Sequence, residues 1–263
     1  MKKFCLATLC LLLIVSCKPK TVEEKTDGSI TIKGTIENPG DAQGELNVMG
    51  FFVEPFYSGN INQDGSFDIV LPDNFDETTQ KAFDNYNSQD SAAYELKPNR
   101  VLDLFLNLDG LETSGLENTI SLAGVYYGFQ VFNDGQRNGA IYPTSSEAFM
   151  TYILEQQQGE AVTGNYYYFI YATDVTSIKG KTTMPLFLSE ENDKSVPYLE
   201  EHDVHLKPGW NIAKYEILRT TKTPDGATIP AHIKKSTVSD LQNTTWFHIT
   251  GSKSAATVDE TAS

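Results

Sequence analysis

The stretch NYYYFIYATD, residues 165–174, places an unbroken run of aromatic and branched apolar side chains between Asn165 and Ala172. Such side chains favour an extended backbone, because they pack well on a pleated surface. Successive side chains of a strand point to opposite faces, so a run without polar alternation indicates burial on both faces. The stretch therefore predicts a fully covered β-strand.

Shorter runs around this stretch alternate apolar and polar residues, and Gly, Pro, Asn or Asp bounds each of them. They include SITIKGTIEN (29–38), which changes phase at Gly34 as at a kink or bulge, ELNVMGFFV (45–53) and SFDIVLP (66–72). TISLAGVYYGFQVF (119–132) predicts a strand pair or one long bent strand, with turn residues after it. Short strands at this spacing indicate an all-β sandwich.

Near the C-terminus, DVHLKPGWNIAKYEIL (203–218) predicts two paired strands around the turn Lys207-Pro208-Gly209, with Trp210 closing one end of the core. The strands form two blocks of ordinary domain size. We therefore predict a mainly β protein with tandem immunoglobulin-like or β-sandwich domains over 30–112 and 118–250. A single larger sandwich is the alternative, and the small polar residues of 251–263 predict a disordered tail.

Three segments depart from the alternating pattern. PTSSEAFMTYILEQQQG (143–159) has capping-box spacing from Thr144 to Glu147 and an apolar stripe typical of a helix, so residues 145–158 are helix or, alternatively, another strand. The acidic segment 73–95 predicts a long surface loop, with a short helix around 77–83 as the alternative. RVLDLFLNL (100–108) is apolar on both faces and predicts a central strand.

The N-terminus has the pattern of a secretory signal, because Lys2 and Lys3 precede the apolar run Phe4–Val15. That run is too short for a permanent transmembrane helix, which needs about 20 apolar residues. The tetrad Ile14-Val15-Ser16-Cys17 resembles the bacterial lipobox. The resemblance implies that 1–16 is removed as a signal peptide and that Cys17 carries lipid chains, which anchor a protein stably.

Cysteine counting agrees with this reading, because Cys5 and Cys10 fall inside the signal and leave Cys17 without a disulfide partner. The alternative is an ordinary signal with a later cut that leaves Cys17 a free thiol. Residues 17–29 carry the lipidated Cys and predict a polar, flexible tether. The acidic Glu23 and Glu24 resemble surface-export signals of Bacteroidota lipoproteins.

The KPGWN turn at 207–211 is similar to that of secreted β-domain lipoproteins of Bacteroidota. These resemblances imply a cell-envelope protein at the outer membrane, facing either the periplasm or the surface. The chain is strongly acidic, with 20 Lys and Arg against 35 Asp and Glu. It would be repelled by nucleic acid and anionic headgroups, so we expect no nucleic-acid partner and attachment through the lipid alone.

No motif in the sequence indicates catalysis or a cofactor. There is no G-x-S-x-G, no phosphate-binding glycine loop, and no cysteine after Cys17 to act as nucleophile. Carboxylates are numerous enough for a glycosidase pair, but their separation depends on the fold. We therefore predict a protein that is not an enzyme.

Two segments could bind metal. In EEHDVH (200–205), strand alternation places Glu201, Asp203 and His205 on one face and His202 on the other; the alternative is a solvated acidic strand edge. NINQDGSFDIVL (60–71) resembles a calcium loop, but its twelfth position lacks the carboxylate such a loop requires. Asp64-Gly65 between alternating runs favours a hairpin there instead.

Aromatic residues offer candidates for stacking on a glycan. They are Trp210, Trp246, Tyr126 and Tyr167, with Tyr127 and Tyr171 as further members, and the alternative for each is packing in the core. Asp90-Ser91-Ala92 resembles the short Bacteroidota O-glycosylation sequon, which implies a glycan on Ser91.

These observations predict a lipid-anchored, non-catalytic envelope protein that acts as a binding or assembly module, with a protein or glycan partner. The alternative is a surface component that binds or processes glycans. A third hypothesis, a structural pilus-like or adhesion subunit, requires an unpaired strand able to accept a partner.

Overall fold

The computed structural model describes residues 22–25, 28–40, 42–50, 53–89, 92–105, 107–123, 128–155, 157, 159–187, 195–241 and 244–250. The predicted signal, the lipidation site Cys17, Ser91, Tyr126, Tyr127 and the tail 251–263 lie outside the described residues. Within the described part, sixteen strands and three helices form a mainly β fold, which confirms the predicted class.

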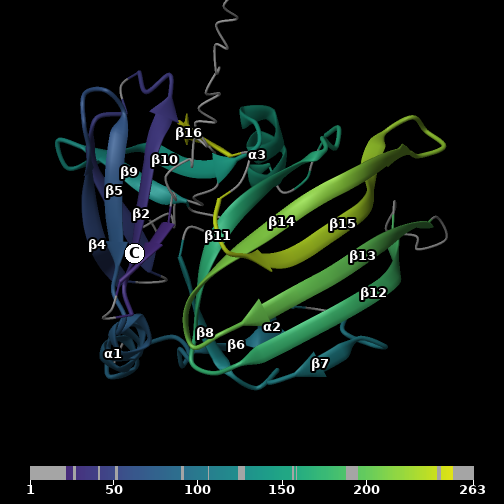
Figure 1. The fold of residues 1–263 in the computed structure, drawn as a ribbon, viewed down its shortest axis with the longest axis horizontal. Helices are drawn as coiled ribbons and strands as arrows, with labels where there is room; N and C mark the ends of the chain where they lie inside the picture. Colours follow the sequence, from purple (N-terminus) through teal and green to yellow (C-terminus); the bar gives the residue numbers. More distant parts are fainter. Residues whose placement is uncertain are drawn as a thin grey trace, which may run out of the picture.

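Seven strands form a closed ring at one side of the molecule (Figure 1). In ring order they are β2 (Ile30–Glu37), β5 (Ser66–Leu71), β4 (Val53–Ile61), β3 (Gly44–Gly50), β9 (Phe129–Asn133), β10 (Gln136–Thr144) and β16 (Thr245–Ile249). The C-terminal strand β16 closes the ring, because it pairs antiparallel with β10 and parallel with β2. The short β1 (Val22–Glu24) also pairs with β2.

An open sheet extends from the ring and carries the two longest hairpins (Figure 1). It joins β10 through the single pair Thr144 and Tyr166. Its strands, in spatial order, are β11 (Gly164–Ala172), β14 (Gly209–Lys222), β15 (Thr228–Val238), β13 (Ser195–Leu206), β12 (Thr176–Phe187) and β7 (Glu112–Ser114). β8 (Thr119–Ala123) also pairs with β11, and β6 (Asn99–Arg100) pairs with β8.

The helix predicted within 145–158 is confirmed as α3 (Glu147–Leu154). Its N-cap is Ser146 and not Thr144: the Ser146 hydroxyl accepts a hydrogen bond from the Phe149 backbone N–H at 3.2 Å. Thr144 instead ends strand β10.

The surface loop predicted over 73–95 is wrong, because Phe75–Asn87 forms helix α1. Its buried side chains, Phe75, Ala82 and Phe83, recur at i, i+7 and i+8, which is one helical face. The many polar residues between them conceal this stripe in the sequence.

The central strand predicted over 100–108 is also wrong, because helix α2 covers Val101–Leu104. Val101 and Phe105 are both buried, and their four-residue spacing places them on one helical face.

The strands on either side of Lys207-Pro208-Gly209 form as predicted, but they do not pair with each other. β15 lies between them, antiparallel to β14 and parallel to β13. The turn is held by Asn211, whose Oδ1 accepts from the Lys207 N–H at 2.9 Å and whose Nδ2 donates to the Lys207 carbonyl at 2.7 Å.

Two hydrophobic cores lie on opposite faces of β11. Tyr167 and Phe169 join the first core, inside the ring, while Tyr166, Tyr168 and Ile170 join the second, which α2 and α3 cover. These contacts confirm that the stretch NYYYFIYATD is buried on both faces. Trp210 also belongs to the first core, and its indole N–H donates to the Pro72 carbonyl at 2.7 Å.

The strands do not divide into two separate sandwiches at 112–118. The ring combines β2 to β5, from the predicted 30–112 block, with β9, β10 and β16, from the 118–250 block. The sequence predicts that Val22–Glu24 is part of the tether. In the structure this segment packs on the ring instead, because Val22 pairs with Ile32 of β2 and is buried. No helix in the described residues is long and apolar enough to cross a membrane.

Candidate functional site

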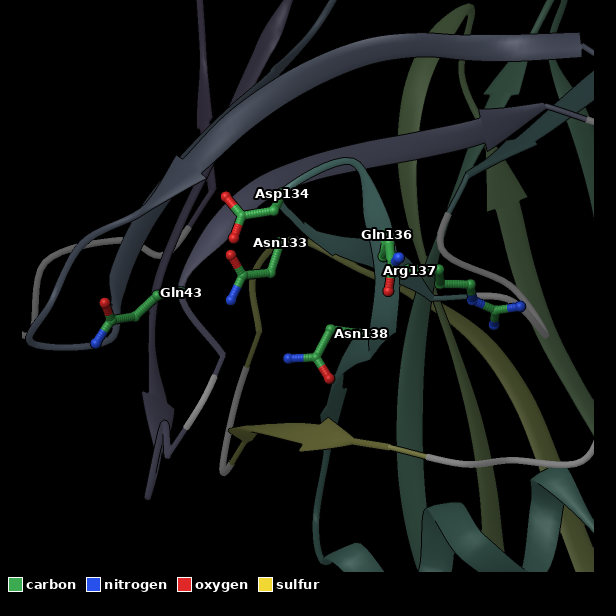
Figure 2. Close-up of a pocket in the computed structure, with 6 residues that line it drawn as sticks. All are labelled: Gln43, Asn133, Asp134, Gln136, Arg137 and Asn138. Carbon is green, nitrogen blue, oxygen red and sulfur yellow. The ribbon is translucent and has the colours of Figure 1, made fainter.

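A polar hollow of about 630 Å³ opens beside the closed ring. Its lining residues come from the turn between β9 and β10 and from the segment before β3: Gln43, Asn133, Asp134, Gln136, Arg137 and Asn138. Figure 2 shows Gln43 on one side of the opening and Asn133, Asp134 and Asn138 on the other, with the Arg137 guanidinium extending away from Gln43. We refer to these six residues as the polar hollow.

A tight turn positions one wall of the hollow. Asn133 and Gln136 are cross-strand partners, and the two residues between them, Asp134 and Gly135, have φ of 50° and 76°. Positive φ at both central positions defines a type I′ turn, for which Asp-Gly is a preferred sequence because both residues tolerate this conformation. The side chains of Asn133, Asp134 and Gln136 therefore project from a rigid hairpin end.

A bulge positions Asn138. The β9–β10 register shifts between Arg137 and Ala140, so Asn138 and Gly139 on β10 lie opposite the single residue Val131 on β9. Gly139 has φ of 96°, and the Asn138 carbonyl lies within hydrogen-bond distance of His248 Nε2 on β16. Bulges redirect side chains and often border functional sites. Here the bulge turns the Asn138 side chain into the hollow, and β16 holds it in place.

The opposite wall is Gln43, whose two neighbours are both fixed. The Ala42 N–H donates to the Pro39 carbonyl at 2.7 Å, and Ala42 is fully buried. Gly44 has φ of 131° and lies so close to β9 that an added Cβ would be 2.0 Å from the Phe132 carbonyl oxygen. Both walls are therefore formed before any ligand binds, which lowers the entropy cost of binding.

The hollow has hydrogen-bonding capacity that the protein does not use. Within the described part of the chain, no hydrogen bond engages the side chains of Gln43, Asn133, Asp134 or Gln136. The three amides each offer donors and an acceptor, and the Asp134 carboxylate accepts. Such a surface can bind a polar ligand, whereas it offers little to an apolar one.

The EEHDVH segment follows the predicted alternation on β13. Glu201, Asp203 and His205 point to the outer face of the open sheet, and His202 points inward with Val204. His205 Nε2 lies 3.5 Å from Asp203 Oδ1. Within the described residues, no group of three His, Cys, Asp or Glu side chains is close enough to hold a metal ion.

Glu201 contacts two lysines and a histidine of the protein itself. Its oxygens lie 2.9 Å from Lys181 Nζ, 3.0 Å from Lys234 Nζ and 3.3 Å from His232 Nε2. Hydrogen bonds from the two lysines lower the pKa of Glu201 to about 2. Positive charges this close to the carboxylate oppose a bound metal ion, so the geometry favours the alternative of a charged outer strand face.

Sequence reasoning missed a buried cluster on the inner face. Glu200 Oε1 lies 2.6 Å from Lys235 Nζ and 3.2 Å from His202 Nε2. The contact with His202 has the distance of an ion pair but not the angle of a hydrogen bond, and His202 Nδ1 has no partner. Burial raises the pKa of Glu200, but His202 and Lys235 outweigh this and lower it to about 2. The Glu200 and His202 side chains are 5% and 0% exposed, so no solvent-borne substrate reaches them.

The described candidates for glycan stacking lie in the first core. Trp210 and Trp246 are each 4% exposed and Tyr167 is 1% exposed. Trp246 packs edge-on against Phe67 with ring centroids 4.8 Å apart. These rings stabilise the fold and present no face to a sugar, which agrees with the core-packing alternative. Tyr171 is partly buried, and its hydroxyl donates to the Asp73 carbonyl.

The hollow itself was not predicted, because NDGQRNG (133–139) was interpreted only as a turn. The available signal was a concentration of amide and charged side chains around Asp-Gly. Gln43 gives no such signal, since it reaches the site only through pairing of β3 with β9.

Comparison with known proteins identifies no relative of this chain. No protein-family model matches it, and neither a curated protein nor a solved structure does so.

Proposed function

We propose that this protein is a lipid-anchored, non-catalytic module of the bacterial cell envelope that binds its ligand in the polar hollow. The hollow is the main support, because it is lined by amide and carboxylate side chains on backbone held by a turn, a bulge and a close strand contact. The lipobox ending at Cys17 supports the anchor and the outer-membrane location.

The lining favours binding over catalysis. Asp134 is the one carboxylate among the six lining residues, whereas glycoside hydrolysis ordinarily uses a pair. Among the described lining residues there is no serine, threonine, cysteine or histidine that could serve as a nucleophile with its base. The polar side chains are therefore suited to holding a ligand in place.

Assembly through a sheet edge has weaker support. β12 pairs with β7 only over Ser177–Lys179, so in the described part of the chain its outer edge beyond Lys179 has no partner strand. This edge carries Lys181 and Pro185, and charged residues and proline are common protections against edge-to-edge pairing. We therefore favour the hollow as the binding surface.

The anchor is tested by metabolic labelling with a clickable palmitate analogue in cells that produce the wild type or Cys17→Ala. We expect label on the wild type only, and protease treatment of intact cells then reports whether the body faces outward. Equal labelling of the two proteins would contradict the lipid anchor.

The binding site is tested by immobilising the full-length protein in detergent and applying polysaccharide, peptidoglycan and protein fractions of the cell envelope. We expect the wild type to retain material from one fraction. The triple variant Gln43→Ala, Asn133→Ala, Gln136→Ala should lose it, while Gln89→Ala, at an exposed position beyond α1, should not. Equal retention by the triple variant and the wild type would show that the hollow is not the site.

A further inference from the structure

We infer that the ligand of the polar hollow is a neutral, polyhydroxylated one, namely a stretch of uncharged glycan with neighbouring hydroxyl groups. This inference rests on the proposed function, because it assumes that the hollow is the binding site. It does not use the aromatic residues first considered for glycan binding, since those described lie in the core.

Hydrogen-bond complementarity points to hydroxyl groups. Each hydroxyl both donates and accepts, and Gln43, Asn133 and Gln136, which line the hollow, each carry an amide with both functions. The two oxygens of Asp134 can accept from two adjacent hydroxyls, as a carboxylate accepts from paired donors. A ligand with only acceptors, such as a carbonyl-rich surface, would leave Asp134 unsatisfied.

Charge argues against an anionic ligand. Asp134 contributes a negative charge to the lining, and the whole chain carries a formal net charge of −15. Arg137 provides the one cation of the lining, and its guanidinium extends away from Gln43 and Asn133 (Figure 2). A phosphate, sulfate or uronate group would therefore meet one carboxylate and a repulsive long-range field.

Charge also argues against a divalent cation. Calcium sites in proteins combine several carboxylates with carbonyl oxygens, whereas the six described lining residues supply one carboxylate, that of Asp134. Calcium binding without glycan binding is retained as an outcome of the test.

The lining is polar, so binding would depend on hydrogen bonds and shape without ring stacking. Affinity for one short glycan is then low, and several membrane-anchored copies on one polysaccharide would gain by avidity. The appropriate probe is therefore a polymer and not a monosaccharide.

The test is affinity electrophoresis of the full-length protein in detergent, through gels that contain dextran, laminarin or galactomannan as neutral polymers and polygalacturonate or heparin as acidic ones. We expect a neutral polymer to retard the wild type and Gln89→Ala equally. Gln43→Ala should weaken this retardation at least fivefold. Asp134→Asn should weaken it less, because Asn tolerates the positive φ of this turn and keeps one acceptor.

Far-ultraviolet circular dichroism and thermal melting of each variant verify that the fold is intact. Retardation by acidic polymers alone would overturn the neutral-glycan inference, and so would calcium binding without polymer binding. In either case the hollow would still be the binding site if Gln43→Ala abolished the observed binding. Absence of retardation by any of the five polymers would overturn the inference, and retention of envelope material would then decide the proposed function separately. Equal retardation of Gln43→Ala and wild type would overturn both.

Discussion

At the scale of single residues, the Glu200–Lys235 ion pair is a buried charged contact whose loss would destabilise the open sheet. Glu200 is buried beside His202, and the Lys235 side chain is 21% exposed. A buried pair adds little net stability relative to apolar residues, but removing one partner leaves the other charge uncompensated. The pair therefore constrains which substitutions the open sheet tolerates.

Glu200→Gln should lower the free energy of unfolding by about 3 kcal/mol. This value is at the lower end of the range for a broken buried ion pair, because the Lys235 side chain is partly exposed to solvent. Urea denaturation measures this loss. The control is Glu201→Gln, whose lysine partners are more accessible to water, and about 1 kcal/mol is expected there. A larger loss for Glu201→Gln than for Glu200→Gln would contradict the assignment.

Stability should depend on acidity through the same two carboxyls. The pKa values of Glu200 and Glu201 are both lowered to about 2 from an ordinary 4.5. The unfolded chain takes up their protons first, so the stability they confer is complete above about pH 4.5 and is lost as the pH falls toward 2. Urea midpoints at pH 6, 4 and 3 should fall steadily, and Glu200→Gln should flatten this fall; an unchanged slope would refute the linkage.

At the scale of elements, the contact between β3 and β9 determines whether the hollow has two walls. Gly44 begins β3 at the point where it approaches the Phe132 carbonyl, and Gln43 immediately precedes it. Gly135, in the β9–β10 turn, also has positive φ, but an added Cβ there would meet nothing within 4 Å. The two glycines thus separate the effect of backbone conformation from the effect of steric contact.

Gly44→Ala should destabilise the protein by about 3 kcal/mol, because the backbone strands must separate to admit a methyl group. Gly135→Ala should cost about 1 kcal/mol, from the positive φ alone. Thermal denaturation of both variants checks the difference, and equal losses would show that β3 and β9 are not in close contact at Gly44.

At the scale of the whole molecule, the ring and the open sheet are coupled. β11 contributes side chains to both cores, and β16, the last strand in the sequence, closes the ring by pairing with β10 and β2. Two independent sandwiches would unfold separately, whereas shared strands favour one cooperative transition.

Calorimetry should therefore record a single unfolding transition for the wild type. Trp246→Ala in the first core and Ile178→Ala in the second should each shift that whole transition to lower temperature, with losses of about 3–5 and 2–5 kcal/mol. Two resolved transitions, with each variant affecting only one, would establish separate folding units instead.

Much of the local structure could be predicted from the sequence. Side-chain periodicity predicted the burial of both faces of β11, the alternation of Glu201 and His202 on β13, and helix α3. Turn chemistry predicted the Asp64-Gly65 hairpin. The α2 helix was not predicted, and α1 was predicted only as the alternative of a short helix around 77–83, because each helix buries too few side chains for a recognisable period. The lipobox at Cys17 likewise needs only contiguous residues, and it stays a prediction.

Strand order and contacts between residues far apart in the sequence could be known only from the tertiary structure. Side-chain alternation in the sequence shows which residues each strand buries, because that pattern is local to the strand. It does not show that β15 separates β13 from β14, that Lys235 meets Glu200, or that Gln43 and Asn133 line one hollow. Those contacts arise because strands from both ends of the chain close one ring and one sheet, and many pairings satisfy the same alternation until the cores are packed.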